Sequence, residues 1–390
     1  MNELELSALD GANPLGFLAA LGTLAVLSET DPQIRLGWRA RARWVPYLCS
    51  PDLQGDEGKK RQDVQQRLAT RLRGKPVDGE KERVREAAQR QFNSAKTQRK
   101  KADEGFKKLG LPARSKEWSA AREKDVVPFE KAFTNAREVR NNALKESVPS
   151  AELALGERPD CTIEEFRERA RTMTMEASST ERVVLDMMAS LGAELSDRND
   201  ERITPTPFSF VNGSGKQWFL DTARQLMTRK NPTQVEPTPT PCVTEANLRR
   251  CLFEAWKYQD EGLSMRWDPI EDSRYALRLD DPGPIGSYTV WMANLLGYVA
   301  LAFFPCAPTS RGSATACWVN TEDAPRFRWP LWFSPLSANS VRSLLTHASL
   351  ASADDESSTR ELRARGIAAV FACRRLRNGK FTNFSPSTAA

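Results

Sequence analysis

The feature that most constrains this chain is a long, highly charged segment between residues 58 and 147. The segment is rich in Lys, Arg, Glu, Gln and Ala, and its few apolar residues recur at helical spacing, as at Val64, Leu68 and Leu72. Glycine–proline sequences near residues 74 and 110 interrupt this pattern and predict breaks between helices. Because the apolar stripe is thin, we expect these helices to protrude or to pack only lightly.

The charge of this segment also differs from that of the rest of the chain. The 390 residues include 57 Lys and Arg against 51 Asp and Glu, a formal net charge of +6. Residues 56–146 contain 25 basic and 15 acidic residues, which is +10 and leaves −4 for the remainder. A basic module on a mildly acidic body predicts a polyanionic partner, because phosphate neutralisation releases counterions. The alternative is a solvated helical surface whose charges pair at i,i+4 spacing.

We therefore predict an α+β protein with a mixed, mostly helical globular body, small antiparallel strand pairs and a long helical insertion. Residues 1–54 form the N-terminal part of the body, residues 55–150 the basic insertion, and residues 151–390 the main body with a C-terminal hairpin. The N-terminus has no basic region typical of a secretory signal. The seven cysteines lack CxxC spacing, which favours buried free thiols in a reducing cytoplasm.

The start of the chain shows the clearest local signals. Residues 3–9 alternate as a strand does, Asn13 is a good helix cap, and Pro14 suits the first helical position. The helix predicted to follow includes Gly16 and Gly22, which cost helix stability. Their presence indicates that another backbone packs very close, or alternatively that a ligand approaches there. Residues 34–45 are expected to form one or two strands.

A stretch without charged residues runs from residue 282 to residue 310. Its apolar part, residues 288–304, is long enough to resemble a membrane span. Asn294 lies in the middle of that part, however, and prolines bracket it. We favour a buried core helix, with no membrane partner.

Three groups of residues are candidates for chemistry. His347 is the single histidine, which weakens histidine-based catalysis and metal chemistry. Residues 212–216 (NGSGK) fail the Walker pattern, but the loop and Lys216 suit one backbone phosphate, with a plain tight turn as the alternative. Asp268, Glu271 and Asp272 could form a metal-binding cluster, although interleaved arginines favour salt bridges in a strand–turn–strand corner. No cofactor or resident metal is predicted.

Basic residues supply the other candidate contacts. Several crowd the hairpin around the turn at residues 378–379, where Phe381 and Phe384 are candidates for stacking on bases. The alternative is an edge hairpin whose charges protect it from aggregation. Further candidates are a loop arginine after the apolar stretch and the QRKK run of the insertion. The predicted nucleic-acid-binding residues are Lys216, Arg311, Arg374, Arg375, Arg377, Lys380, Arg99, Lys100 and Lys101.

Several blocks of the body resemble the subtype I-G (formerly I-U) CRISPR-associated proteins, within them the compact large-subunit-like or helicase-extension group. The blocks are ALDGANPLGFLAALGTL, FSFVNGSGKQWFLDTARQL, RWDPIEDSRYALR, NLLGYVALAFFPCAPTSRG, and WPLWFSPLSANSVRSLL followed by RGIAAVFACRRLRNGKFTNFSP. The resemblance covers residues 4–50 and 200–386 and leaves out the basic insertion.

The resemblance implies a non-catalytic subunit of a CRISPR RNA-guided complex, with CRISPR RNA, target DNA and other effector subunits as partners. Large subunits of this kind contact the 5′ end of the guide, read the short motif flanking the target and hold displaced DNA. We expect this chain to read duplex or guide shape more than base sequence. Two alternatives remain at this point. One is an adaptor whose insertion docks proteins, and the other is a metal-dependent nuclease built on the acidic cluster at residues 268–272.

Overall fold

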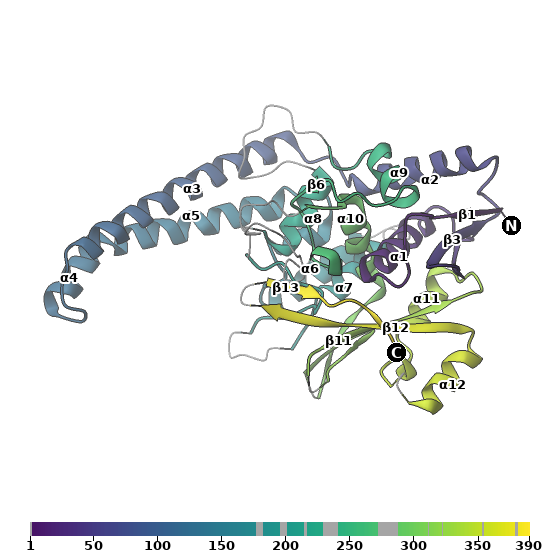
Figure 1. The fold of residues 1–390 in the computed structure, drawn as a ribbon. Coiled ribbons are helices and arrows are strands. Elements are labelled where there is room, and N and C mark those ends of the chain that lie inside the picture. Colours follow the sequence, from purple (N-terminus) through teal and green to yellow (C-terminus); the bar gives the residue numbers. More distant parts are fainter. Residues whose placement is uncertain are drawn as a thin grey trace. The chain divides into compact units, whose positions relative to one another are not determined.

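The chain is described by a computed structural model (Figure 1) that places residues 2–176, 182–195, 201–213, 217–228, 241–271, 288–310, 312–321, 323–352, 355–378 and 381–390. These residues divide into two compact units. The arm is the segment Lys75–Gly156, and the body consists of the described residues before and after it. Helices and small antiparallel strand pairs confirm the predicted α+β class.

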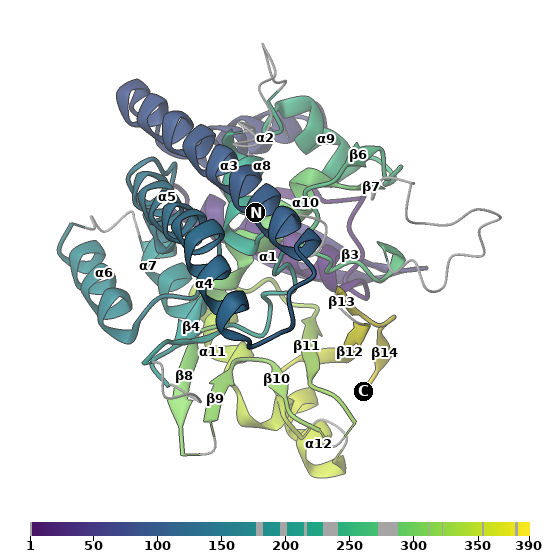
Figure 2. The same ribbon diagram turned by 90° about the vertical axis from the view of Figure 1, so that its left-hand side faces the viewer.

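The arm is a helical hairpin. Its elements are α3 (Gly79–Lys108), α4 (Lys116–Asp125), α5 (Val127–Glu146) and the short 3₁₀ helix η1 (Ala151–Leu155). Helices α3 and α5 run side by side in both views (Figure 1, Figure 2). Few apolar groups hold them together, as the thin stripe predicts: Phe92 and Phe133 pack with ring centroids 5.2 Å apart, and the Arg140 guanidinium covers Phe92 at 4.3 Å.

The arm begins later and ends later than the predicted insertion at residues 55–150. Helix α2 (Glu57–Leu72) belongs to the body and packs on α1 (Pro14–Ser28) and α9 (Glu245–Phe253). Its apolar stripe is the reason, because Val64, Leu68 and Leu72 are at most 1% exposed. A stripe that is thin by composition is thus enough to bury one face of a helix.

Helix α1 lies in the core of the body. Every residue from Pro14 to Leu27 is buried, and Asn13 caps the helix by accepting hydrogen bonds from the backbone N–H groups of Leu15 and Gly16. A Cβ atom at Gly22 would lie only 1.9 Å from the carbonyl oxygen of Leu296 in α10 (Trp291–Val299). The predicted close approach of a second backbone is therefore confirmed.

Two antiparallel sheets flank this core. The first has the order β1-β3-β2, formed by Asn2–Glu5, Trp44–Ser50 and Arg35–Ala40. The second has the order β10-β11-β12-β13, formed by Trp318–Val319, Arg326–Trp332, Ile367–Asn378 and Phe381–Phe384, and β14 (Thr388–Ala389) also pairs with β12. The indole of Trp332 in β11 links the two sheets by donating to the carbonyl of Leu36 in β2 at 2.7 Å, and Leu36 also forms an isolated bridge with Leu336, just after β11.

Shorter elements complete the body. The remaining helices are α6 (Ile163–Glu176), α7 (Arg182–Ser190), α8 (Phe219–Thr228), α11 (Ala338–Leu345) and α12 (Glu356–Ala364), with 3₁₀ turns η4 (Pro269–Glu271), η6 (Ala300–Phe303) and η7 (Ala348–Leu350). The small strands are β4 (Gly192–Ala193), β5 (Thr204–Pro205), β6 (Asp260–Glu261), β7 (Tyr288–Thr289), β8 (Cys306–Thr309) and β9 (Gly312–Thr315).

The apolar stretch folds as the core-helix prediction expects. Residues 292–303 of α10 and η6 are all buried in the body. In the part of the chain that the structure describes, no helix combines the length and apolar character needed to cross a membrane. All seven cysteines are free thiols, and six of them are buried.

Candidate functional site

The C-terminal hairpin separates its arginines instead of presenting them together. Arg375 pairs with Phe384 and Arg377 with Thr382 across β12 and β13, while Arg374 faces the other side. Arg374 and Arg377 are exposed. Arg375 is partly buried, with its guanidinium 5.2 Å from the ring of Phe210, and burial together with the charge of Arg377 lowers its pKa. Arg375 is therefore mainly a packing residue.

The two hairpin phenylalanines also have different roles. Phe384 is fully buried against Phe210, at a centroid distance of 4.7 Å, so it cannot stack on a base. Phe381 is 44% exposed, and the Arg266 guanidinium lies 4.8 Å from its ring centroid. Phe381 and the half-buried Arg266 therefore form a cation–aromatic surface at this edge, a combination that suits stacking and phosphate contact. Arg377 pairs with Thr382 and so lies on the other face of the hairpin.

The basic run of the arm also spreads over more than one face. Successive helix residues are rotated by about 100°, so Arg99, Lys100 and Lys101 cannot share a face. Arg99 turns toward α5, with its guanidinium 4.9 Å from the ring of Phe133 and 3.7 Å from Asp103. Lys100 and Lys101 are exposed, and Lys100 lies 3.6 Å from Glu104. Part of this run thus forms the i,i+4 pairs of the solvated-helix alternative.

Three predicted contact residues, Lys216, Arg311 and Lys380, lie outside the described residues, as does Asp272 of the acidic cluster. The predicted contact residues that the structure does describe lie in two places, residues 99–101 of the arm and residues 374–377 of the hairpin.

The acidic corner holds a buried polar network. Asp268 is 1% exposed and accepts hydrogen bonds from the Asn13 amide at 3.0 Å and from the Tyr258 hydroxyl at 2.8 Å. The backbone N–H of Ile270 donates to it at 3.2 Å. Burial raises the pKa of Asp268, and these hydrogen bonds partly offset that rise. Asn13 links this carboxyl to the capped end of α1.

Glu271 extends the network toward α10. Its oxygens accept hydrogen bonds from the hydroxyls of Ser264 and Thr289. Asn294, the polar residue inside the apolar stretch, donates to Thr289 at 2.8 Å and accepts from the backbone N–H of Met265 at 2.8 Å. Burial, followed by the nearby charge of Asp268, raises the pKa of Glu271 to about 7.

Among the described residues, hydrogen bonds hold Asp268 and Glu271, whereas Asp272 and the arginines at 274 and 278 of the salt-bridged corner expected from sequence lie outside the described residues. Residues 264–267 are not a strand, and residues 269–271 form a 3₁₀ turn. Asp268 and Glu271 are held by neutral donors, which satisfy buried carboxyls without the flexibility of an arginine. Leu263 and Arg266 adopt positive φ angles of 52° and 61°, so the corner is conformationally strained.

The same hydrogen bonds disfavour the proposed metal cluster. A divalent cation needs free, ionised carboxylate oxygens. The oxygens of Asp268 and Glu271 already accept hydrogen bonds, and burial raises the pKa of both carboxyls, which works against the ionised form that a cation needs. Among the described residues, no group of three or more His, Cys, Asp or Glu side chains is arranged to hold a metal ion.

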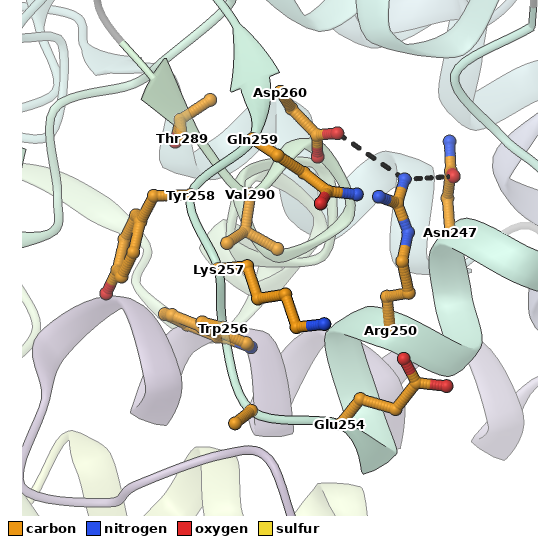
Figure 3. Close-up of a pocket in the computed structure, with 11 residues that line it drawn as sticks. Asn247, Arg250, Glu254, Trp256, Lys257, Tyr258, Gln259, Asp260, Thr289 and Val290 are labelled. Atoms are coloured by element: carbon orange, nitrogen blue, oxygen red, sulfur yellow. Dashed lines mark hydrogen bonds and ion pairs between the residues drawn. The ribbon is translucent and has the colours of Figure 1, made fainter.

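A pocket of about 140 Å³ lies beside this network (Figure 3). The side chains of Arg250, Lys257 and Gln259 project into the same space. Arg250 is paired with Asp260 at 3.5 Å and hydrogen-bonded to Asn247 at 2.5 Å. Because the lining carries both cations and carboxylates, it does not select a ligand of one charge.

The sequence does not predict this pocket, because no clear pattern marks the end of the helix that precedes it. Helix α9 ends at Phe253, where Glu254 adopts an extended conformation at φ −117° and ψ 147°. No glycine or proline marks the end of α9 in the sequence. Trp256 and Tyr258 therefore enter a loop, where Tyr258 (φ 48°) reaches Asp268. The cluster of aromatic and polar residues in WKYQD (residues 256–260) is the feature of the sequence that could have indicated a pocket here.

His347 has a structural role. It caps η7, with Nδ1 accepting from the backbone N–H of Ser349 at 3.3 Å, and its Nε2 lies 3.7 Å from Glu361. It lies just after α11 and caps the start of this turn.

The sequence matches no known protein-family profile, and no curated protein is significantly similar to it.

Proposed function

We propose that this chain is a non-catalytic, nucleic-acid-binding subunit of a type I-G CRISPR RNA-guided complex that acts in the cytoplasm with RNA or DNA and other effector subunits. The assignment to subtype I-G rests on the resemblance between sequence blocks of the body and the proteins of that subtype. The nucleic-acid partner rests on the distribution of charge. The arm supplies phosphate contacts, and the surface of Phe381 and Arg266 supplies a stacking contact.

The proposal of a polyanionic partner rests on one observation, the distribution of charge along the chain. Residues 75–156 contain 19 Lys and Arg against 13 Asp and Glu, a net charge of +6. The rest of the chain contains 38 of each, so the arm holds the whole formal net charge. Cations such as Lys96, Lys107 and Lys131 are exposed along its helices. A thin, solvated and basic helical pair fits phosphate contact, since phosphate neutralisation needs accessible cations more than shape.

The buried network of the body supports a non-catalytic role. Its carboxyls connect the capped start of α1 to α10 through Asn13, Asp268, Glu271 and Asn294. Such a network orients core elements, which fits a structural role for these carboxyls. Incubation of the purified chain with Mg²⁺ or Mn²⁺ tests the nuclease alternative, which predicts cleavage that Asp268→Ala abolishes.

A binding titration tests the proposal. We expect the full chain to bind labelled single-stranded RNA or DNA, or duplex, with an affinity that falls steeply between 50 and 200 mM salt. The variant K96E/K107E/K131E/R137E removes four exposed cations of the arm. If each contacts a phosphate, the slope of log K against log [salt] should shrink by about 3–4 and affinity should fall by at least about tenfold.

The matched control, K59E/R249E/R360E/R363E, reverses four exposed cations of the body and the same total charge. It should bind more tightly than the arm variant. Equal losses in both variants would mean that net charge alone attracts nucleic acid, and a salt slope near zero would refute the proposal.

A further inference from the structure

The arm carries an apolar groove at the end where α3 approaches α4 and the start of α5. The groove has a volume of about 460 Å³, within the range of ligand pockets. Its apolar lining comes from Ala102, Phe106 and Leu109 of α3 and from Phe129 of α5. All of these residues belong to the arm.

The exposure of this lining is unusual for helices so rich in charge. Leu109 is 51% exposed and Phe129 is 37% exposed. Ala102, Gly105 and Leu109 follow i, i+3, i+7 spacing, so they form one stripe along α3. Phe106 is held by an edge-on contact with Trp118 of α4, with centroids 5.5 Å apart. The groove is thus a defined surface in which an uncovered apolar stripe lies beside a fixed aromatic ring.

Basic residues are in excess around the groove, although its lining also carries Asp125, and this excess favours an acidic occupant of the groove. Lys101 lines it, and Lys108 lies two turns further along the same side of α3. Residues 96–131 contain 11 Lys and Arg against 6 Asp and Glu. A second copy of this chain would bring an equally basic tip, and like charges would repel. A nucleic acid has no aliphatic side chains with which to cover such an apolar stripe, so it is a poorer occupant than a protein helix.

We propose that this groove docks an acidic amphipathic helix of a partner protein. The apolar face of that helix would cover Leu109 and Phe129, and its carboxylates would lie beside Lys101 and Lys108. Asp125, on the lining, would pair with a basic residue of the helix and fix its direction. Helix-in-groove docking of this kind uses anchors at i, i+3, i+4 and i+7. This role is separate from phosphate contact along the arm.

A designed peptide provides the probe. It is a labelled 21-residue helix with leucine at i, i+3, i+4 and i+7 positions and glutamate on its other face. Two control peptides have the same composition in scrambled order, or lysine in place of glutamate. We expect the full chain to bind the first peptide with an anisotropy change, and to bind both controls at least about tenfold more weakly.

Matched variants of the protein locate the binding. L109S/F129S should weaken binding of the acidic peptide by about tenfold or more. V84S/V139S replaces two residues of the same helices that are 55% and 44% exposed and outside the groove, and it should bind as the unmodified chain does. Circular dichroism should show equal helicity for both variants, since all four side chains are substantially exposed. RNA and DNA affinity should be unchanged in both.

The proposal is overturned if the acidic peptide does not bind, if it binds no better than its controls, or if L109S/F129S and V84S/V139S lose equal affinity. Light scattering supplies an independent check. A concentration-dependent dimer that L109S/F129S abolishes would make a second copy the occupant and would also overturn the proposal.

Discussion

At the residue scale, Glu271 is the side chain whose environment departs most from its sequence context. The sequence RWDPIED suggested a carboxylate among arginines. The structure instead buries the carboxyl between the hydroxyls of Ser264 and Thr289, and burial raises its pKa to about 7. The protonated form is thus favoured more in the folded chain than in the unfolded chain, where the pKa is near 4.5.

This shift predicts how stability depends on pH. The contribution of Glu271 is fully present below pH 4.5 and is lost as the pH rises through about 7. We expect the free energy of unfolding to fall by roughly 2–3 kcal/mol between pH 5 and pH 8, at about 1.4 kcal/mol per pKa unit. Glu271→Gln keeps the shape and removes the titration, so its stability should vary less over this range.

Urea denaturation at the two pH values measures the effect. Glu261→Gln, at an exposed position, is the control and should keep the pH dependence of the unmodified chain. An equal pH dependence in Glu271→Gln and in the unmodified chain would show that Glu271 is not the titrating group.

At the element scale, the contact between α1 and α10 determines how the core of the body packs. The prediction of a close backbone came from two glycines in one helix. Gly16 lies against the backbone of Asp10, and Gly22 lies against the backbone of Leu296. Only the second is a contact between helices, and it joins the start of the chain to the apolar stretch.

A pair of glycine substitutions tests this contact. Gly22→Ala places a Cβ 1.9 Å from a backbone oxygen that cannot rotate away, so we expect a loss of about 3 kcal/mol or more. Gly105→Ala in α3 meets nothing within 4 Å and should gain up to about 1 kcal/mol through helix propensity. Thermal unfolding followed by circular dichroism should therefore show shifts of opposite sign. A Gly22→Ala protein as stable as the unmodified chain would contradict the close packing.

At the scale of the whole molecule, the arm and the body differ in how much of each is buried. The arm relies on a few ring contacts, whereas α2 contributes three fully buried side chains to the body. The two ends of the arm are also close, since the backbone N–H of Lys75 donates to the carbonyl of Pro149 at 2.8 Å. The arm can therefore be excised at this point without removing the core of the body.

Two deletions separate these units. Removing residues 76–148 and joining the ends with a short Gly-Ser linker should leave a folded body whose unfolding temperature is little changed and whose affinity for nucleic acid is lost. Removing residues 56–146 also deletes α2, and the loss of Val64, Leu68 and Leu72 should destabilise the body by several kcal/mol. Equal stability of the two proteins would place α2 outside the body core.

Local sequence patterns determined much of this protein. Helical spacing, the Asn13-Pro14 cap and small residues indicated α1, and the apolar stretch indicated a buried α10. Charge counts identified the basic arm, and the turn sequence at residues 378–379 indicated the hairpin of β12 and β13. These features depend on residues a few positions apart, which is why the sequence reveals them. The nucleic-acid partner and the CRISPR subtype stay predictions.

Tertiary structure alone decided the rest. Asn13 and Asp268 are 255 residues apart in sequence but share a hydrogen bond, and no local pattern encodes that meeting. The assignment of α2 to the body, the burial of Arg375 and Phe384, and the exposure of Leu109 and Phe129 likewise depend on which surfaces meet. Burial is a property of the assembled fold, so it separates a packing arginine from a contact arginine only after the fold is known.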